Sequence, residues 1–139
     1  MADDVGSMLL RAGLIGQEEL DEARQNVKEL GGTIPERLVQ RGHIKDEALT
    51  AFYRTRLLIT RVNPSQLAKI SASLLDKLPP DMAAEFRSIP VAIDGDGNLT
   101  LVMSDPSDSE AVDEIGFFTG SYIVRATATQ AQISWCLAH

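Results

Sequence analysis

An internal repeat constrains the fold of this chain more than any other feature of its sequence. Residues 15–20 read IGQEEL, and residues 44–49 read IKDEAL. A repeat at a fixed offset identifies the structural unit from which a chain is built. The matched positions of the first copy are Val5, Leu9, Leu10, Gly13, Ile15, Glu18 and Leu20; those of the second are Ile34, Leu38, Val39, Gly42, Ile44, Glu47 and Leu49.

Each copy of the repeat predicts a pair of helices joined by a turn. Leu9 and Leu10 follow Val5 by one helical turn, which makes an apolar stripe. Gly13 permits the left-handed backbone that ends a helix, and acidic residues open the next one. Capping residues indicate where the helices begin. Asp3 or Asp4 caps the first predicted helix, and Thr33 caps the third, with Glu36 three residues later at capping-box spacing. The predicted helices span residues 3–12, 17–30, 34–41 and 45–56.

The second half of the chain predicts a small sheet with flanking helices. Strands are expected at 89–93 and 99–103, joined by a polar turn at 94–98, and at 121–126. Helices are expected at about 66–70, 72–78, 80–86, 108–118 and up to 137. The helix at 108–118 is expected to point Ala111, Val112, Ile115 and Phe118 inward. The predicted fold class is α+β: a four-helix repeat subdomain (1–60), then a small α+β subdomain (61–139) with an antiparallel sheet.

Composition narrows the classes of function. The net charge of -7 argues against a broad nucleic-acid-binding face, since such faces gather Lys and Arg. No apolar run reaches the length of a membrane span, so direct membrane insertion is not expected. The single Cys136 requires no oxidising compartment, and cytoplasm is the expected location. The chain ends inside a helical pattern, so we expect it to be a piece of a longer protein.

The sequence predicts neither a catalytic site nor a metal site. His43 and His139 have no partner at metal-ligand spacing. Asp94 lies in the predicted hairpin turn, and Asp105 and Asp108 are typical loop and capping residues. The phosphate-loop pattern GxxxxGK[ST] does not occur, so no ATP hydrolysis is expected from this chain.

Two arginines leave a binding role open. Arg24 and Arg56 lie towards the ends of the second and fourth predicted helices. One interpretation is a solvated helix face. The other is a pair of side chains that contact an anion by charge-assisted hydrogen bonds.

The order of motifs resembles the N-terminal domain of the type II secretion and type IV pilus assembly ATPases. The double repeat is followed by LPP at 78–80, IPV at 89–91, LTLVMSDP at 99–106 and FFTG at 117–120. The family's strand ends in [AS]-D-P and its helix ends in F-x-T-G. The resemblance covers essentially the whole chain. It implies a docking module that precedes the ATPase engine and binds the inner-membrane platform of the machine.

Some members of that family bind cyclic di-GMP through both repeats, using a motif that begins R-L-G and ends in Gln. In the first repeat, Asp4, Val5 and Gly6 stand at the R-L-G positions; in the second, Thr33, Ile34 and Pro35 do.

Neither repeat keeps the motif's Arg or its Gln. Val27 and Arg56 stand at the two Gln positions, and Arg24 stands at the motif's fourth Leu. Asp4 has the wrong charge for a phosphate, and Pro35 lacks a backbone donor. The resemblance therefore favours a protein-docking module without a cofactor. The alternative is a cyclic di-GMP sensor with a degenerate site made of Val5, Gly6, Arg24, Ile34 and Arg56.

For the docking role, the fourth predicted helix supplies the candidate contacts. Phe52 and Tyr53 are adjacent, so they cannot lie on the same face of a helix. We expect Phe52 to be the exposed ring and to bind a partner together with Arg56; in the alternative, both rings lie between the subdomains. The expected partner is a protein of the secretion or pilus platform, or its ATPase. The resemblance implies that the chain is cytoplasmic and is recruited to the cytoplasmic face of the inner membrane.

Overall fold

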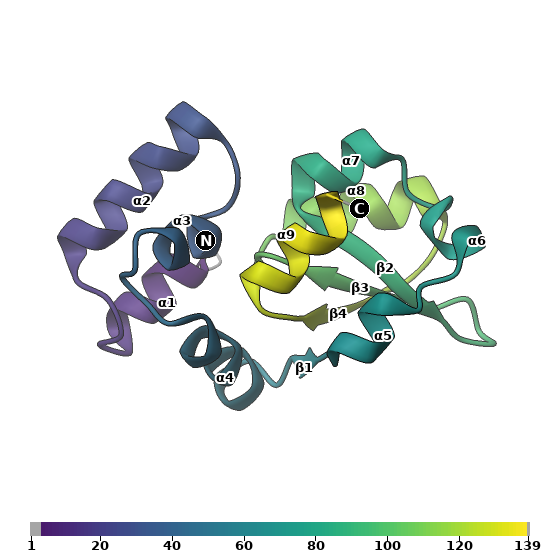
Figure 1. The fold of residues 1–139 in the computed structure, drawn as a ribbon, viewed down its shortest axis with the longest axis horizontal. Coiled ribbons are helices and arrows are strands. Elements are labelled where there is room, and N and C mark those ends of the chain that lie inside the picture. Colours follow the sequence, from purple (N-terminus) through teal and green to yellow (C-terminus); the bar gives the residue numbers. More distant parts are fainter. Residues whose placement is uncertain (1–3, 139) are drawn as a thin grey trace.

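The computed structural model describes residues 4–138, which form a helical half followed by a sheet half (Figure 1). Asp3, the alternative cap, and His139 lie outside these residues. The helical half contains α1 (Val5–Arg11), α2 (Gln17–Leu30), α3 (Ile34–Gln40) and α4 (Asp46–Arg56). The sheet half contains β1 (Thr60–Arg61), α5 (Pro64–Ala68), α6 (Ala72–Leu75), α7 (Pro80–Phe86), β2 (Ser88–Ile93), β3 (Leu99–Met103), α8 (Ser109–Thr119), β4 (Ile123–Thr127) and α9 (Gln130–Ala138).

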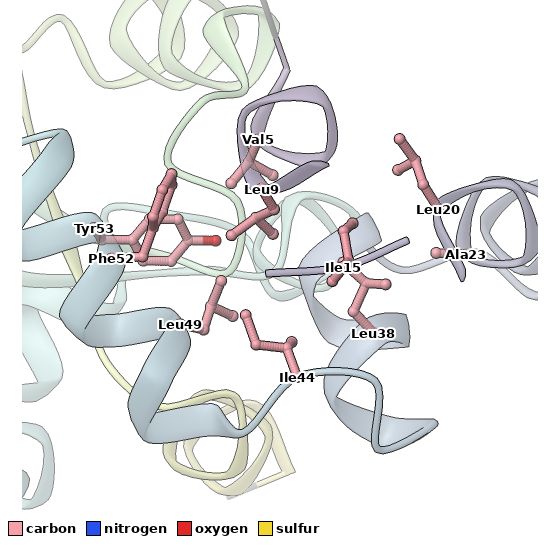
Figure 2. Packing of buried hydrophobic residues seen from close by; sticks show 10 residues of the cluster. All are labelled: Val5, Leu9, Ile15, Leu20, Ala23, Leu38, Ile44, Leu49, Phe52 and Tyr53. Atoms are coloured by element: carbon pink, nitrogen blue, oxygen red, sulfur yellow. The ribbon is translucent and has the colours of Figure 1, made fainter. Parts of the chain in front are cut away.

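The repeat is a structural unit, as its spacing predicts. Equivalent residues of the two copies belong to one core, as do Leu9 and Leu38, and likewise Leu20 and Leu49 (Figure 2). The full set of buried side chains is Val5, Leu9, Ile15, Leu20, Ala23, Leu38, Ile44, Leu49, Phe52 and Tyr53. The turn glycines also match, because Gly13 has φ 76° and Gly42 has φ 75°. Both therefore adopt the left-handed backbone that glycine tolerates best.

The expected caps of α1 and α3 are present. The carboxylate of Asp4 accepts a hydrogen bond from the backbone N–H of Ser7 (2.8 Å). The hydroxyl of Thr33 accepts one from the N–H of Glu36 (3.2 Å). Each cap satisfies a backbone donor that has no partner inside its helix.

The α+β class is confirmed, but the sheet is mixed rather than antiparallel. The strand order is β1-β4-β3-β2, and only the β2–β3 pair is antiparallel. β4 runs parallel to both β3 and β1. The reason is the connection: a tight turn joins β2 to β3, whereas the helix α8 carries the chain back before β4 begins. β1 was not expected, because its two residues carry no strand pattern.

Helices cover both faces of this sheet (Figure 1). On one face, Leu99, Leu101 and Met103 of β3 pack against side chains of α6 and α8, together with Leu78. On the other face, Val102 packs with residues of α5 and α9. All the β3 side chains but Thr100 are buried, as expected for a central strand covered on both faces. Among the described residues, no helix has the length and apolar character required to cross a membrane.

Polar contacts join the two halves. Arg87 reaches from the end of α7 to Glu36 on α3, with its Nη2 atom 2.6 Å from Glu36 Oε2 and 2.7 Å from Ser134 Oγ. The Asp46 carboxylate at the start of α4 accepts hydrogen bonds from the N–H groups of Gln130 (2.7 Å) and Ala131 (3.1 Å). Asp46 therefore caps α9 across the junction, where a negative charge is favourable.

We predict that Glu36→Gln weakens the junction between the halves. Removing one partner of a buried ion pair costs about 3–5 kcal/mol, and we expect about 2–3 kcal/mol here because Arg87 keeps its bond to Ser134. Urea denaturation measures this loss, and Glu29→Gln on the exposed side of α2 serves as the matched control. Equal stability of the two variants would contradict the prediction.

Candidate functional site

Four of the five residues proposed for the degenerate nucleotide site gather around the start of α1. Val5 and Gly6 are buried there. A Cβ atom placed on Gly6 would lie 2.5 Å from Leu20 Cδ1 and 3.4 Å from Ile34 Cγ2. Arg24 reaches the same place from α2, with its Nη2 atom 3.2 Å from Ser7 Oγ. Gly6 therefore serves the packing of α1 against α2 and α3, which accounts for a glycine at this motif position.

The charges at the start of α1 are already paired. Arg24 Nη2 lies 3.5 Å from Asp4 Oδ2. Partial burial raises the pKa of Asp4, but the hydrogen bonds from Ser7 and the positive charge of Arg24 outweigh burial and lower that pKa below its usual range. Asp4 is thus a carboxylate that caps a helix and holds the guanidinium next to it. A phosphate that approaches Arg24 would therefore meet the negative charge of Asp4.

The second repeat places its motif residues against the sheet half. Thr33 Oγ1 lies 2.6 Å from Ser104 Oγ, and the Ser104 hydroxyl donates to Gln130 Oε1 (2.6 Å). In the first repeat, the N–H of Val5 donates to Ser107 Oγ (3.1 Å). Both R-L-G positions therefore face the loop that follows β3. They contribute helix caps and contacts between the halves.

Arg56 does not join this group. It is exposed and lines a shallow hollow with Met8, Arg11 and Leu57, at the other end of α1. The structure therefore brings Val5, Gly6, Arg24 and Ile34 together and leaves Arg56 apart.

The expectation that Phe52 is an exposed ring is wrong. Phe52 is 7% exposed and Tyr53 is fully buried, with their rings edge to face and their centroids 6.3 Å apart (Figure 2). Both rings belong to the hydrophobic core of the helical half. Burial, with the charges of Asp105 and Asp46, raises the pKa of Tyr53 well above its usual value.

The carboxylates considered for chemistry have structural partners. Asp94 accepts hydrogen bonds from the N–H groups of Asp96 and Asn98, both at 2.9 Å, as in a polar hairpin turn. Asp108 caps α8, and Asp105 accepts from Ser107. Across residues 4–138, no group of His, Cys, Asp and Glu side chains is arranged to hold a metal ion.

Sequence reasoning missed an aromatic surface on the sheet half. Phe117 is 92% exposed, Phe118 is 56% exposed and Tyr122 is 74% exposed. We call these three residues the α8 patch. Phe118 was expected to point inward, and that expectation is wrong, because Ala111 and Ile115 already occupy the inward face of α8. The available signal was the adjacent pair of Phe residues, which cannot both face the core.

Carboxylates surround the α8 patch. Two surface hollows lie on either side of Phe117, and Asp113 lines both of them. Glu114 lines the hollow next to Phe118. Desolvation and the negative charges of the neighbouring Glu110 and Glu85 raise the pKa of Glu114. We call Glu85, Glu110, Asp113 and Glu114 the acidic rim.

Comparison with known proteins identifies relatives of both halves. The MshEN domain family matches residues 59–139, which is the sheet half. The type IV pilus assembly ATPase PilB of Thermus thermophilus is 28% identical over 135 residues, and PilB of Myxococcus xanthus is 28% identical over 133. Each alignment covers 96% of this chain, but only 15% of the first protein and 23% of the second.

Solved structures share the fold. The N-terminal domain of XpsE has a TM-score of 0.73 at 22% identity, covering 99% of this chain and 97% of that one. The structure of MshE with cdg has a TM-score of 0.65 at 22% identity, covering 99% of this chain and 98% of that one.

We predict that Gly6→Ala destabilises the protein by about 1–3 kcal/mol, because the added methyl group overlaps Leu20 in a filled core. The matched control is Gly95→Ala, where nothing lies within 4 Å of the added carbon. Thermal unfolding of both variants measures the difference. If Gly6→Ala melts like the control, α1 does not depend on this close approach.

Proposed function

This chain belongs to the MshEN domain family, and we propose that it is a non-catalytic docking module of a type II secretion or type IV pilus assembly ATPase. Family membership confirms the resemblance inferred from the sequence. The proposed partner is a protein of the inner-membrane platform or the ATPase engine itself. Because the chain spans under a quarter of the PilB proteins that it matches, any ATPase activity is proposed to lie in a separate domain.

The α8 patch is the observation that carries this proposal. Exposed clusters of large apolar side chains mark sites of interaction with other molecules, and aromatic residues are enriched at protein interfaces. Phe117 contributes little to the core of this chain, since 92% of its surface is exposed. The acidic rim around it resembles the polar border of a protein interface. We place the docking event at the cytoplasmic face of the inner membrane.

The residues of the helical half remain a second proposed contact. Arg56 is exposed and free of any role in the core, and it stays in the proposal as a partner-binding residue. Phe52 contributes only the small part of its ring that borders the same hollow. We therefore expect Phe52→Ala to act mainly on stability.

The alternative function is a cyclic di-GMP sensor with a degenerate site. Two observations favour it: the shared fold with MshE, whose structure contains cdg, and the position of Arg24 beside the first R-L-G segment. The occupants of the motif's arginine positions oppose it. Asp4 brings a negative charge, and Thr33 is engaged with Ser104. We therefore rank it second.

For the docking function, we predict that the purified cytoplasmic regions of the cognate platform proteins bind this chain through the α8 patch. Phe117→Ala should weaken binding about tenfold or more, as expected for an aromatic anchor worth about 2 kcal/mol. Because the Phe117 side chain is exposed, we expect Phe117→Ala to leave the melting temperature unchanged. The control is Leu30→Ala, which removes another exposed apolar side chain (66% exposed) on α2. Absence of binding by the wild-type chain to every platform protein and to the ATPase engine would overturn the docking function.

For the alternative, we predict that cyclic di-GMP binds weakly. Two missing charge-assisted hydrogen bonds cost about 1.5–3 kcal/mol each, which lowers affinity by about a hundredfold or more. Isothermal titration calorimetry measures this affinity, with Arg24→Ala as the paired variant. If cyclic di-GMP binds with a dissociation constant below about 10 μM and Arg24→Ala abolishes this binding, the sensor function would be favoured over the docking function.

A further inference from the structure

The solvent face of α8 is a single stripe of carboxylates and aromatic rings. Its exposed members are spaced at i, i+3, i+4, i+7 and i+8, the spacing that places residues on one helix face. They are Glu110, Asp113, Glu114, Phe117 and Phe118. Ala111 and Ile115 face the sheet on the opposite side. The stripe is therefore acidic along the first part of α8 and aromatic along the last.

The surface beside this stripe is shaped to receive apolar side chains. One hollow lies between α7 and α8, lined by Met82, Asp113, Glu114, Phe117 and Phe118. The second lies between α8 and the start of β4, and Phe117 and Tyr122 line it. Phe117 thus stands as a ridge between two hollows. Ridges and hollows of this kind are how one helix packs against another.

The charge around the stripe is unbalanced. Glu85 on α7 adds a fourth carboxylate beside Glu114, and within residues 4–138 no Lys or Arg forms an ion pair with the rim. The nearest cation that lines the hollows is Arg125, and its Nη1 atom already donates to the Pro106 carbonyl at 2.6 Å. A cation that approaches the rim relieves this repulsion.

We propose that the α8 patch and the acidic rim bind a cationic amphipathic helix of the partner protein. The apolar face of this helix packs on Phe117, Phe118 and Tyr122, and its Lys or Arg side chains pair with the rim. The inference rests on the proposed docking function and adds the chemistry of the partner. Charge complementarity of this kind selects partners and speeds their encounter.

The acidic rim also discriminates against two other occupants. An anionic lipid surface is repelled by four carboxylates next to the aromatic rings. A second copy of this chain, with net charge -7, would bring its own acidic rim against the first. A cationic helix is the occupant that satisfies both the apolar and the charged parts of the surface.

The test uses two labelled helical peptides with the same Leu face, one carrying Lys and the other carrying Glu at its polar positions. Fluorescence anisotropy at low ionic strength measures their binding to the whole chain. The Lys peptide should bind about tenfold or more tightly than the Glu peptide, and added salt should reduce the difference. Phe117→Ala should weaken binding of the Lys peptide about tenfold.

A charge-reversal pair separates the patch from general attraction to an acidic protein. Glu110→Lys/Glu114→Lys should reverse the preference between the peptides. Glu18→Lys/Glu29→Lys makes the same change in net charge on α2, again with one substitution in the first turn of a helix, and should retain the preference. The inference would be overturned if both double variants lost the preference for the Lys peptide equally, or if the wild-type chain bound both peptides equally.

The same variants distinguish failure of this inference from failure of the docking function. If the platform proteins bind and the patch reversal leaves that binding unchanged, docking stands and the cationic-helix inference falls. If no platform protein binds but the peptide preference holds, the surface chemistry stands and the docking function falls. Sedimentation that shows a dimer dissolved by Phe117→Ala would identify a second copy as the occupant and overturn the inference.

Discussion

The ion pair between Glu36 and Arg87 is the contact on which the arrangement of the two halves depends most. Arg87 ends α7 in the left-handed backbone region, with φ 47°, which costs about 1–2 kcal/mol for a residue with a side chain. That strained turn delivers the guanidinium to a Glu36 side chain that is almost fully buried. Charges withdrawn from water are stable only when paired, so the pair tolerates little displacement of one half against the other.

Local signals in the sequence predicted the elements, whereas long-range contacts decided their arrangement. The bounds of α2 and the caps at Asp4 and Thr33 follow from patterns within a few residues. The Thr33–Glu36 spacing predicted a reciprocal capping box, yet the Glu36 carboxylate pairs with Arg87 instead. The parallel β1–β4 pair also depends on a long-range contact. Its paired residues Thr60 and Ala126 are 66 positions apart in the sequence.

In the candidate sites, too, the sequence predicted local features but not the long-range contacts. The motif comparison grouped Val5, Gly6 and Arg24 in one hypothetical nucleotide site, which stays a prediction; in the structure Arg24 contacts Ser7, next to Gly6. The sequence could not show that Asp4 already pairs with Arg24. It also could not show that both rings of the adjacent pair Phe52–Tyr53 are buried, whereas both rings of the adjacent pair Phe117–Phe118 are exposed. Whether an aromatic residue near the end of a helix is exposed depends on how distant segments of the chain pack around it.

Both motif arginine positions are occupied by residues that already have a structural role, since Asp4 caps α1 and Thr33 caps α3. An arginine at position 4 would lose the carboxylate that caps α1 and holds Arg24, and a larger side chain at position 33 would displace the Thr33–Ser104 contact. Each gain of a phosphate ligand would thus cost a helix cap worth about 0.5–2 kcal/mol, and the gain at position 33 would also cost a contact between the halves. These contacts preorganise the junction, and preorganisation favours the proposed docking function because little order is then lost on binding.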